Sequence, residues 1–202
     1  NGVWSYGLLD PNFSNFQLYT FRIGPGGDIL MWANEPNLRD WCMPSNPDSF
    51  GNFSQNVAAG YLYYPEWPHK MYWAEGMVNF MTPNSSNPEL KPCARFTAPS
   101  SDTYDMEAIF RNSVTDESEC KVFVFVNSIE MDSAVLSGFG YASNPADPTQ
   151  TQPDPGSVFT YDASLSLAAG DTVDFVNSNY GNGYHYHHVG LEINITNPTS
   201  GY

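Results

Sequence analysis

Apolar side chains recur at every second position over long parts of this 202-residue chain. In residues 103–110, "TYDMEAIF", and 159–167, "FTYDASLSL", apolar residues alternate with polar or small ones, as in strands that have one buried face. No stretch of ten or more residues keeps a 3.6-residue period without an interrupting Gly or Pro. The pattern therefore predicts an all-β protein.

The segment "CKVFVFVNS" differs, because both of its faces are apolar. Val122, Val124 and Val126 share one face, and Phe123 and Phe125 share the other. Such a strand needs cover on both sides. Either a long loop from the irregular first half of the chain covers the second face, or another subunit does.

The segment "AAGDTVDFV" predicts a turn at Gly170 and Asp171, followed by a strand. In this strand Val173 and Phe175 should face inward, and Asp174 should face solvent, as Asp171 does.

Residues 143–157, "SNPADPTQTQPDPGS", are rich in Pro and Asp and predict an exposed loop inside the series of strands. Apolar residues make up 41% of the chain, which is enough for a sizeable core. We therefore expect one domain over residues 1–202. Its fold should be a single antiparallel β-sandwich of jelly-roll type with long irregular loops in the first half.

Charge limits the partners that this chain can have. There are 22 acidic and 7 basic residues, for a formal charge of −15, and no cluster of Lys or Arg. This balance argues against nucleic acid and anionic membranes. Asn, Ser, Thr, Gly, Pro and Tyr are plentiful, so the surface should be polar mainly through hydroxyls and amides, which suits sugar contacts or a crowded assembly. No apolar run approaches the roughly 20 residues that span a bilayer.

The location and covalent modifications follow from weaker signals. The sequence starts at Asn1 without Met or a basic segment, which predicts a secreted, extracellular protein whose signal peptide has been removed. The cysteines lack C-x-x-C spacing, so one disulfide and one spare thiol are expected, with the pairing open. The disulfide candidates are Cys42, Cys93 and Cys120. The glycosylation candidates are Asn12, Asn52, Asn84 and Asn194.

Five segments, in chain order, resemble one known family: "NGVWSYG", "CARFTAPSSDTY", "VFVFVNSIEM", "LSLAAGDTVDFV" and "GNGYHYHHVGLEINI". They are similar to the secreted jelly-roll-like β-sandwich domains of bacterial surface proteins of the PEP-CTERM-associated type. The resemblance implies a non-catalytic extracellular domain that binds or displays carbohydrate.

The chain departs from this family in several places. Asp102 replaces a usual glycine, His187 and His188 stand where the family tends to have Asp and a small residue, and the sorting tail is absent. The family also tends to have a strand before the N-G-x-W opening. A neighbouring subunit could supply that strand by β-augmentation.

The stretch "NGYHYHHVGLEI" holds three of the four histidines. If Leu191 faces inward, His185 and His187 lie on the same inner side and His188 faces outward. Two imidazoles at i and i+2 can ligate a metal, but a site needs a third ligand, and the remaining histidine is His69. Hydrogen-bonded strand histidines are the preferred interpretation.

Aromatic residues make a better candidate site, because Trp and Tyr stack on the apolar faces of sugars. The alternative is structural: the run from 61 to 73 packs its rings over the strand at 120–126. The contact candidates are Trp4, Tyr6, Trp32, Tyr61, Tyr63, Tyr64, Trp67, Tyr72, Trp73, Tyr184 and Tyr186.

Acidic loop residues such as Asp102, Asp147 and Asp154 permit a calcium site, although no spaced D-x-D-x-D-G loop is present and an ordinary solvated surface is preferred. The motifs G-x-S-x-G and H-E-x-x-H are also absent, so the chain is not expected to be an enzyme.

Two contact functions remain. The preferred one is a self-assembling structural subunit of an extracellular filament, coat or matrix, which uses the two-faced strand. The alternative is a free carbohydrate-binding module that uses exposed Trp and Tyr.

Overall fold

A computed structural model describes residues 3–19, 21–23, 38–42, 52–64, 71–82, 90–114, 119–142, 147, 149–179 and 188–197. The regular structure in these residues is entirely β, and all paired strands in them are antiparallel. The all-β prediction is confirmed.

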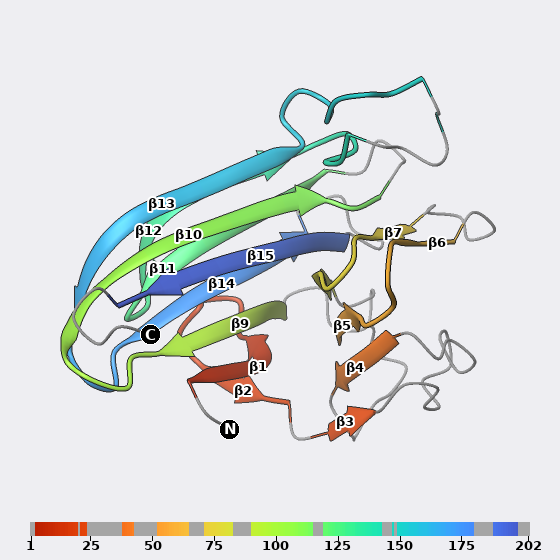
Figure 1. Cartoon of the computed structure of the whole chain (residues 1–202). Helices are drawn as coiled ribbons and strands as arrows, with labels where there is room; N and C mark the ends of the chain where they lie inside the picture. Colours follow the sequence, from red (N-terminus) through yellow and green to blue (C-terminus); the bar gives the residue numbers. More distant parts are fainter. Residues whose placement is uncertain are drawn as a thin grey trace.

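Most strands belong to two sheets that stack face to face (Figure 1). Sheet A has the order β12 (Ile129–Leu136), β11 (Cys120–Val126), β14 (Thr172–Asn179), β9 (Lys91–Thr97), β1 (Trp4–Leu9) and β2 (Phe16–Leu18). Sheet B has the order β13 (Val158–Leu167), β10 (Asp102–Asn112), β15 (His188–Thr196), β8 (Val78–Met81), β5 (Asn52–Asn56), β4 (Leu38–Cys42) and β3 (Phe21–Ile23). A short hairpin pairs β6 (Leu62–Tyr64) with β7 (Met71–Trp73).

The chain crosses repeatedly between the sheets: β10 lies in sheet B, β11 and β12 in sheet A, β13 in sheet B, β14 in sheet A and β15 in sheet B. The turn at Gly170, where φ is +91°, carries the chain from β13 to β14, as predicted. The fold is a β-sandwich of jelly-roll type.

The inner faces of the sheets form the main core. Along β10, every second side chain from Tyr104 to Phe110 is buried, which confirms the predicted alternation. Val122 and Val124 of β11 and Phe175 of β14 face them from sheet A, and the rings of Phe110 and Phe175 lie 6.3 Å apart. The period of two thus fills the space between the sheets from both sides.

The outer face of sheet A is covered by the loop between β1 and β2. The ring of Phe13 lies 5.0 Å from that of Phe123 and 4.7 Å from that of Phe125, and both of these side chains are buried. Asp10 holds this loop by accepting hydrogen bonds from Ser14 N at 2.7 Å and Ser14 Oγ at 2.9 Å. The second apolar face of β11 is therefore covered by the chain's own loop, the first of the two predicted alternatives.

The outer face of sheet B is covered by a second cluster. Tyr72 and Trp73 of β7 pack there with Met77, Phe139 and Tyr141. The prediction that the run from 61 to 73 covers the strand at 120–126 is wrong for its β7 part. Tyr72 N donates to Ser113 O at 3.0 Å, which fixes β7 beside the end of β10 in the opposite sheet.

Gly190 of β15 lies directly beneath this second cluster. A Cβ atom at this position would collide with Met77 Sδ and with Tyr141 Oη, whose hydroxyl donates a hydrogen bond to that sulfur. Glycine is required here because the covering side chains approach the backbone closely.

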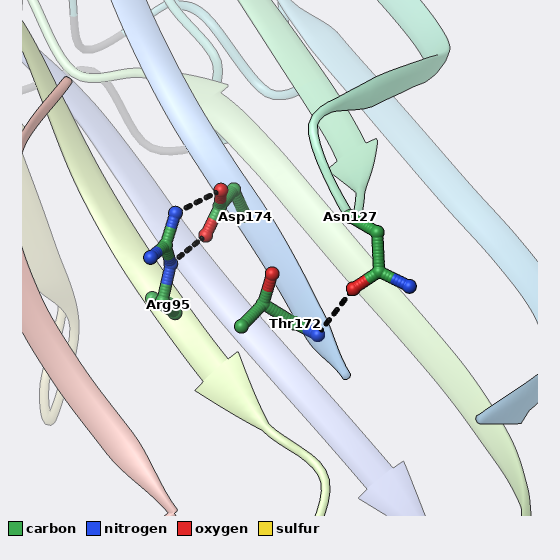
Figure 2. A network of polar contacts seen from close by, with 4 residues as sticks. All are labelled: Arg95, Asn127, Thr172 and Asp174. Carbon is green, nitrogen blue, oxygen red and sulfur yellow. Dashed lines mark hydrogen bonds and ion pairs between the residues drawn. The ribbon is translucent and has the colours of Figure 1, made fainter. Parts of the chain in front are cut away.

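Asp174 was predicted to face solvent, and this prediction is wrong, because the side chain is buried. Arg95 of β9 donates from Nε to Asp174 Oδ1 at 2.6 Å and from Nη2 to Oδ2 at 2.7 Å (Figure 2). The guanidinium also lies over the ring of Phe16, 4.2 Å from its centroid. Phe16, the first residue of β2 after the loop that covers sheet A, thus also covers this ion pair.

Cys93 and Cys120 are free, buried thiols, so the predicted disulfide does not join them. Cys93 packs with the cluster on the outer face of sheet A, whereas Cys120 belongs to the core between the sheets. Every pair that the three cysteines could form contains Cys93 or Cys120, so the prediction of a disulfide is wrong. No helix in the described part of the chain is long and apolar enough to cross a bilayer.

Candidate functional site

A pocket of about 460 Å³ opens between the two sheets where β8 begins. Leu191 and Val78 are the last described pair between β15 and β8. From Glu192 onward, the described residues of β15 pair only with β10. The volume lies within the range of about 300–1,000 Å³ that is typical of small-molecule sites. The pocket is lined by Trp4, Tyr6, Ala74, Glu75, Gly76, Met77, Val78, Ala94, Leu191, Glu192 and Ile193.

Two half-buried rings, those of Trp4 and Tyr6, line the pocket from sheet A. They are two positions apart on β1, so both side chains point to the same side of the strand, toward sheet B. The ring of Trp4 lies 5.5 Å from that of Phe96, and the ring of Tyr6 lies 5.0 Å from that of Phe53. The core thus holds both rings in place at the edge of the pocket.

The register between β1 and β9 creates the space beside these rings. Tyr6 pairs with Ala94, whose side chain is a single methyl group. A larger residue at position 94 would extend into the pocket. Burial raises the pKa of Tyr6, so its phenol stays protonated at neutral pH and can both donate and accept hydrogen bonds.

Two carboxylate residues line the pocket from the side of sheet B. Glu75 lies in the turn before β8, where Gly76 has a φ of +71°, and its Oε2 accepts a hydrogen bond from Gly60 N at 3.2 Å. Glu192 of β15 accepts a hydrogen bond from Arg111 Nε at 3.1 Å, and its side chain is half exposed. Aromatic rings beside carboxylates can stack on a polyhydroxylated ligand and hydrogen-bond to it.

Of the predicted contact aromatics, Trp4 and Tyr6 are brought together in this pocket. Tyr72 and Trp73 are buried beneath the surface of the second cluster, so their prediction as exposed contacts is wrong. Tyr61 is exposed and stacks on Tyr72, with 5.3 Å between the ring centroids, and Tyr63 is half-buried. The candidates outside the described residues or side chains are Trp32, Tyr64, Trp67, Tyr184 and Tyr186.

The histidine cluster is described only at His188. This residue lies on the outer side of β15 relative to Leu191, as predicted, but it is buried against Trp73, with 5.8 Å between the rings. His185 and His187 lie outside the described residues.

The acidic candidates for calcium bind nearby groups of the protein instead of converging on one point. Asp102 accepts from Thr103 N, Asp147 from Thr149 N, and Asp154 from Phe139 N. Within the residues that the structure describes, no group of three or more His, Cys, Asp or Glu side chains could hold a metal ion.

Among the glycosylation candidates, Asn12 and Asn194 are exposed. Asn84 and the side chain of Asn52 lie outside the described part of the structure. Occupancy of all four sequons stays a prediction.

Sequence reasoning missed Glu75, Ala94 and Glu192. The alternation along the last strand places Glu192 on its polar side, but nothing local marks it as part of a pocket. The role of Ala94 depends on its pairing with Tyr6, more than 80 residues away in sequence, and no sequence signal reports this register.

No protein-family model matches this chain, and no curated protein matches it. Its fold is similar to that of solved carbohydrate-binding modules. A module described as CBM51 from Clostridium perfringens GH95, in complex with methyl-galactose, has a TM-score of 0.40 at 8% identity, with 70% of this chain and 85% of that chain covered. A structure described as "CBM4 structure and function" has a TM-score of 0.36 at 8% identity, with coverages of 89% and 96%.

A family 35 carbohydrate-binding module from an environmental isolate has a TM-score of 0.33 at 16% identity, with coverages of 72% and 96%. At these identities and TM-scores the likeness concerns the fold alone.

Proposed function

We propose that this chain is a carbohydrate-binding domain and that the pocket beside Trp4 and Tyr6 holds a sugar unit. The observation that carries the proposal is the pairing of two half-buried aromatic rings with two carboxylate residues around one open pocket. The rings would stack on the C–H faces of the sugar, and the carboxylate of Glu75 would accept hydrogen bonds from its hydroxyls.

The proposed role is binding without a chemical step, and it includes the extracellular location that the sequence predicts. The resemblance to secreted bacterial surface domains is compatible with this role and stays part of the proposal.

Affinity electrophoresis through gels containing different polysaccharides tests the proposal. The informative variant is Ala94→Leu, which fills the pocket from its floor and leaves both rings in place. Overpacking costs about 1–3 kcal/mol of stability, so thermal unfolding has to show that the variant is folded under the assay conditions. We expect the wild-type protein to be retarded by at least one polysaccharide and the folded variant to migrate freely.

Tyr61→Ala is the matched control, because it removes an exposed ring that does not line the pocket. It should be retarded as strongly as the wild-type protein. The proposal fails if no polysaccharide in a broad panel retards the wild-type chain. It also fails if Ala94→Leu binds like wild type while Tyr61→Ala does not.

Self-assembly is a second candidate, supported by one observation on β12. This edge strand of sheet A carries three exposed apolar side chains, those of Ile129, Met131 and Val135, with exposed fractions of 67%, 48% and 39%. An exposed edge strand can pair with another chain. The covered face of β11 no longer supports this candidate, because Phe13 occupies that face.

Light scattering and negative-stain images of the native protein distinguish the two candidates. An assembly built through β12 should form large regular particles that dissociate in Met131→Lys. A monomer at high concentration would refute this second candidate and leave the sugar-binding proposal intact.

A further inference from the structure

We infer that the pocket selects sugars by charge: it binds amino sugars with a free, protonated amine more tightly than their N-acetylated forms, and it discriminates against uronic acids and sulfated sugars. This inference rests on the proposed carbohydrate function and deepens it by naming the ligand class.

The charged residues that line the pocket carry a single sign. Glu75 and Glu192 are both acidic, and none of the described lining residues is Lys, Arg or His. In each carboxylate one oxygen takes part in a described hydrogen bond, from Gly60 N or from Arg111 Nε. Glu192 alternates with Leu191 and Ile193, which face the core, so its side chain lies beside Arg111 on the outer face of sheet B. The second oxygen of the Glu75 carboxylate can accept a further hydrogen bond, and an ammonium group is a strong donor to it.

The described cations lie away from the lining. Lys91, Arg95 and Lys121 lie over the rings of Phe13, Phe16 and Phe123, in the layer that covers sheet A. They are therefore separated from the pocket by sheet A itself. An anionic sugar in the pocket would meet the negative charge of Glu75, and no described lining residue carries a positive charge that could offset it.

Among the described basic side chains, that of Arg111 contacts a lining residue, because it pairs with Glu192. It does not line the pocket. Its Nη1 donates to Gly140 O at 3.3 Å, and its guanidinium lies 5.8 Å from the ring centroid of Tyr141. These contacts hold the cation over the outer face of sheet B, so it weakens the negative field of Glu192 without presenting a donor to the ligand. Glu75, for which the described residues show no ion pair, is thus the main determinant of selectivity.

The size of the preference follows from the exposure of these carboxylates. An ion pair at a solvent-exposed position contributes little to the free energy of binding. Each pair between a carboxylate and the ammonium group should therefore tighten binding by about two- to fivefold. The preference should decline as salt is added, because the pocket is open to solvent.

The test compares chitosan oligomers with their fully N-acetylated counterparts and with oligogalacturonate, by titration calorimetry at mildly acidic pH and low salt. We expect the affinity of the wild-type protein to be highest for the chitosan oligomers and lowest for oligogalacturonate. Glu75→Gln should lower the ratio of the chitosan to the N-acetylated affinity by about two- to fivefold.

Glu107→Gln is the matched control, because it removes the same charge from an exposed position of β10 that does not line the pocket. It should keep the wild-type ratio. If Glu107→Gln lowers the ratio as much as Glu75→Gln, the preference comes from the overall charge of −15, and the inference is overturned.

The remaining outcomes separate this inference from the function on which it rests. If the wild-type protein binds the N-acetylated oligomers or oligogalacturonate as tightly as chitosan, charge selection is wrong and sugar binding stands. If it binds none of these ligands and no polysaccharide in the gel panel, the proposed function fails as well.

Discussion

Replacing Arg95 by Met should destabilise the fold strongly, because it leaves a buried carboxylate without its cation. The Asp174 side chain is 2% exposed, whereas that of Arg95 is 20% exposed. Removing one partner of a buried ion pair costs about 3–5 kcal/mol. Since water cannot reach Asp174, we expect Arg95→Met to cost about 3–4 kcal/mol.

Asp174→Asn should cost less, about 2–3 kcal/mol, because the partly exposed guanidinium of Arg95 can still be hydrated. In the double variant neither charge is left alone, so its cost should fall short of the sum of the two single costs by at least about 1.5 kcal/mol. Urea unfolding, followed by tryptophan fluorescence at neutral pH, measures all three free energies.

A coupling energy below about 0.5 kcal/mol would refute this reasoning, since it would mean that the two groups contribute independently. Arg111→Met with Glu192→Gln is a suitable reference cycle. That pair has 24% and 50% exposed side chains and a single contact at 3.1 Å, and its coupling should not exceed about 1 kcal/mol.

Three further changes test other parts of the structure. Phe13→Ala should cost about 1–2 kcal/mol in urea unfolding and increase the binding of a hydrophobic dye, because it uncovers the phenylalanines of β11; unchanged dye binding would contradict the covering role. Ser128→Gly should raise stability by up to about 1 kcal/mol, because φ is +65° in the turn between β11 and β12, and a lower melting temperature would argue against this. Burial raises the pKa of both the Cys93 and the Cys120 thiols, so mass spectrometry should find them unmodified by a thiol reagent in the folded protein and modified in urea; rapid labelling without urea would show that these sites are accessible.

The strands were predictable because their signal is local. The alternation in β10 and β13 is contained in ten or eleven neighbouring residues, and the structure buries the expected side of each strand. The two-faced pattern of β11 likewise predicted that cover was needed. It did not say which segment supplies the cover, because that depends on contacts between distant parts of the chain.

The incorrect predictions also concern features that depend on contacts between distant parts of the chain. Asp174 sits on the polar side of an alternating strand, which is solvent-exposed only if nothing covers it, and here Arg95 and the loop near Phe16 do. The pocket was predictable only in its two aromatic residues. Its position depends on where β8 begins and on the methyl group of Ala94 opposite Tyr6, and both are set by strand register.

The cover over β11 has a consequence for the order of folding during synthesis. Phe13 and its neighbour Phe123 lie about 110 positions apart in the sequence, so the loop leaves the ribosome long before the strand that it protects. When β11 emerges, its second row of phenylalanines can be buried at once only if the segment around Phe13 is still free to dock. Anything that sequesters this segment in the nascent protein, such as a premature partner, would leave this row open to aggregation.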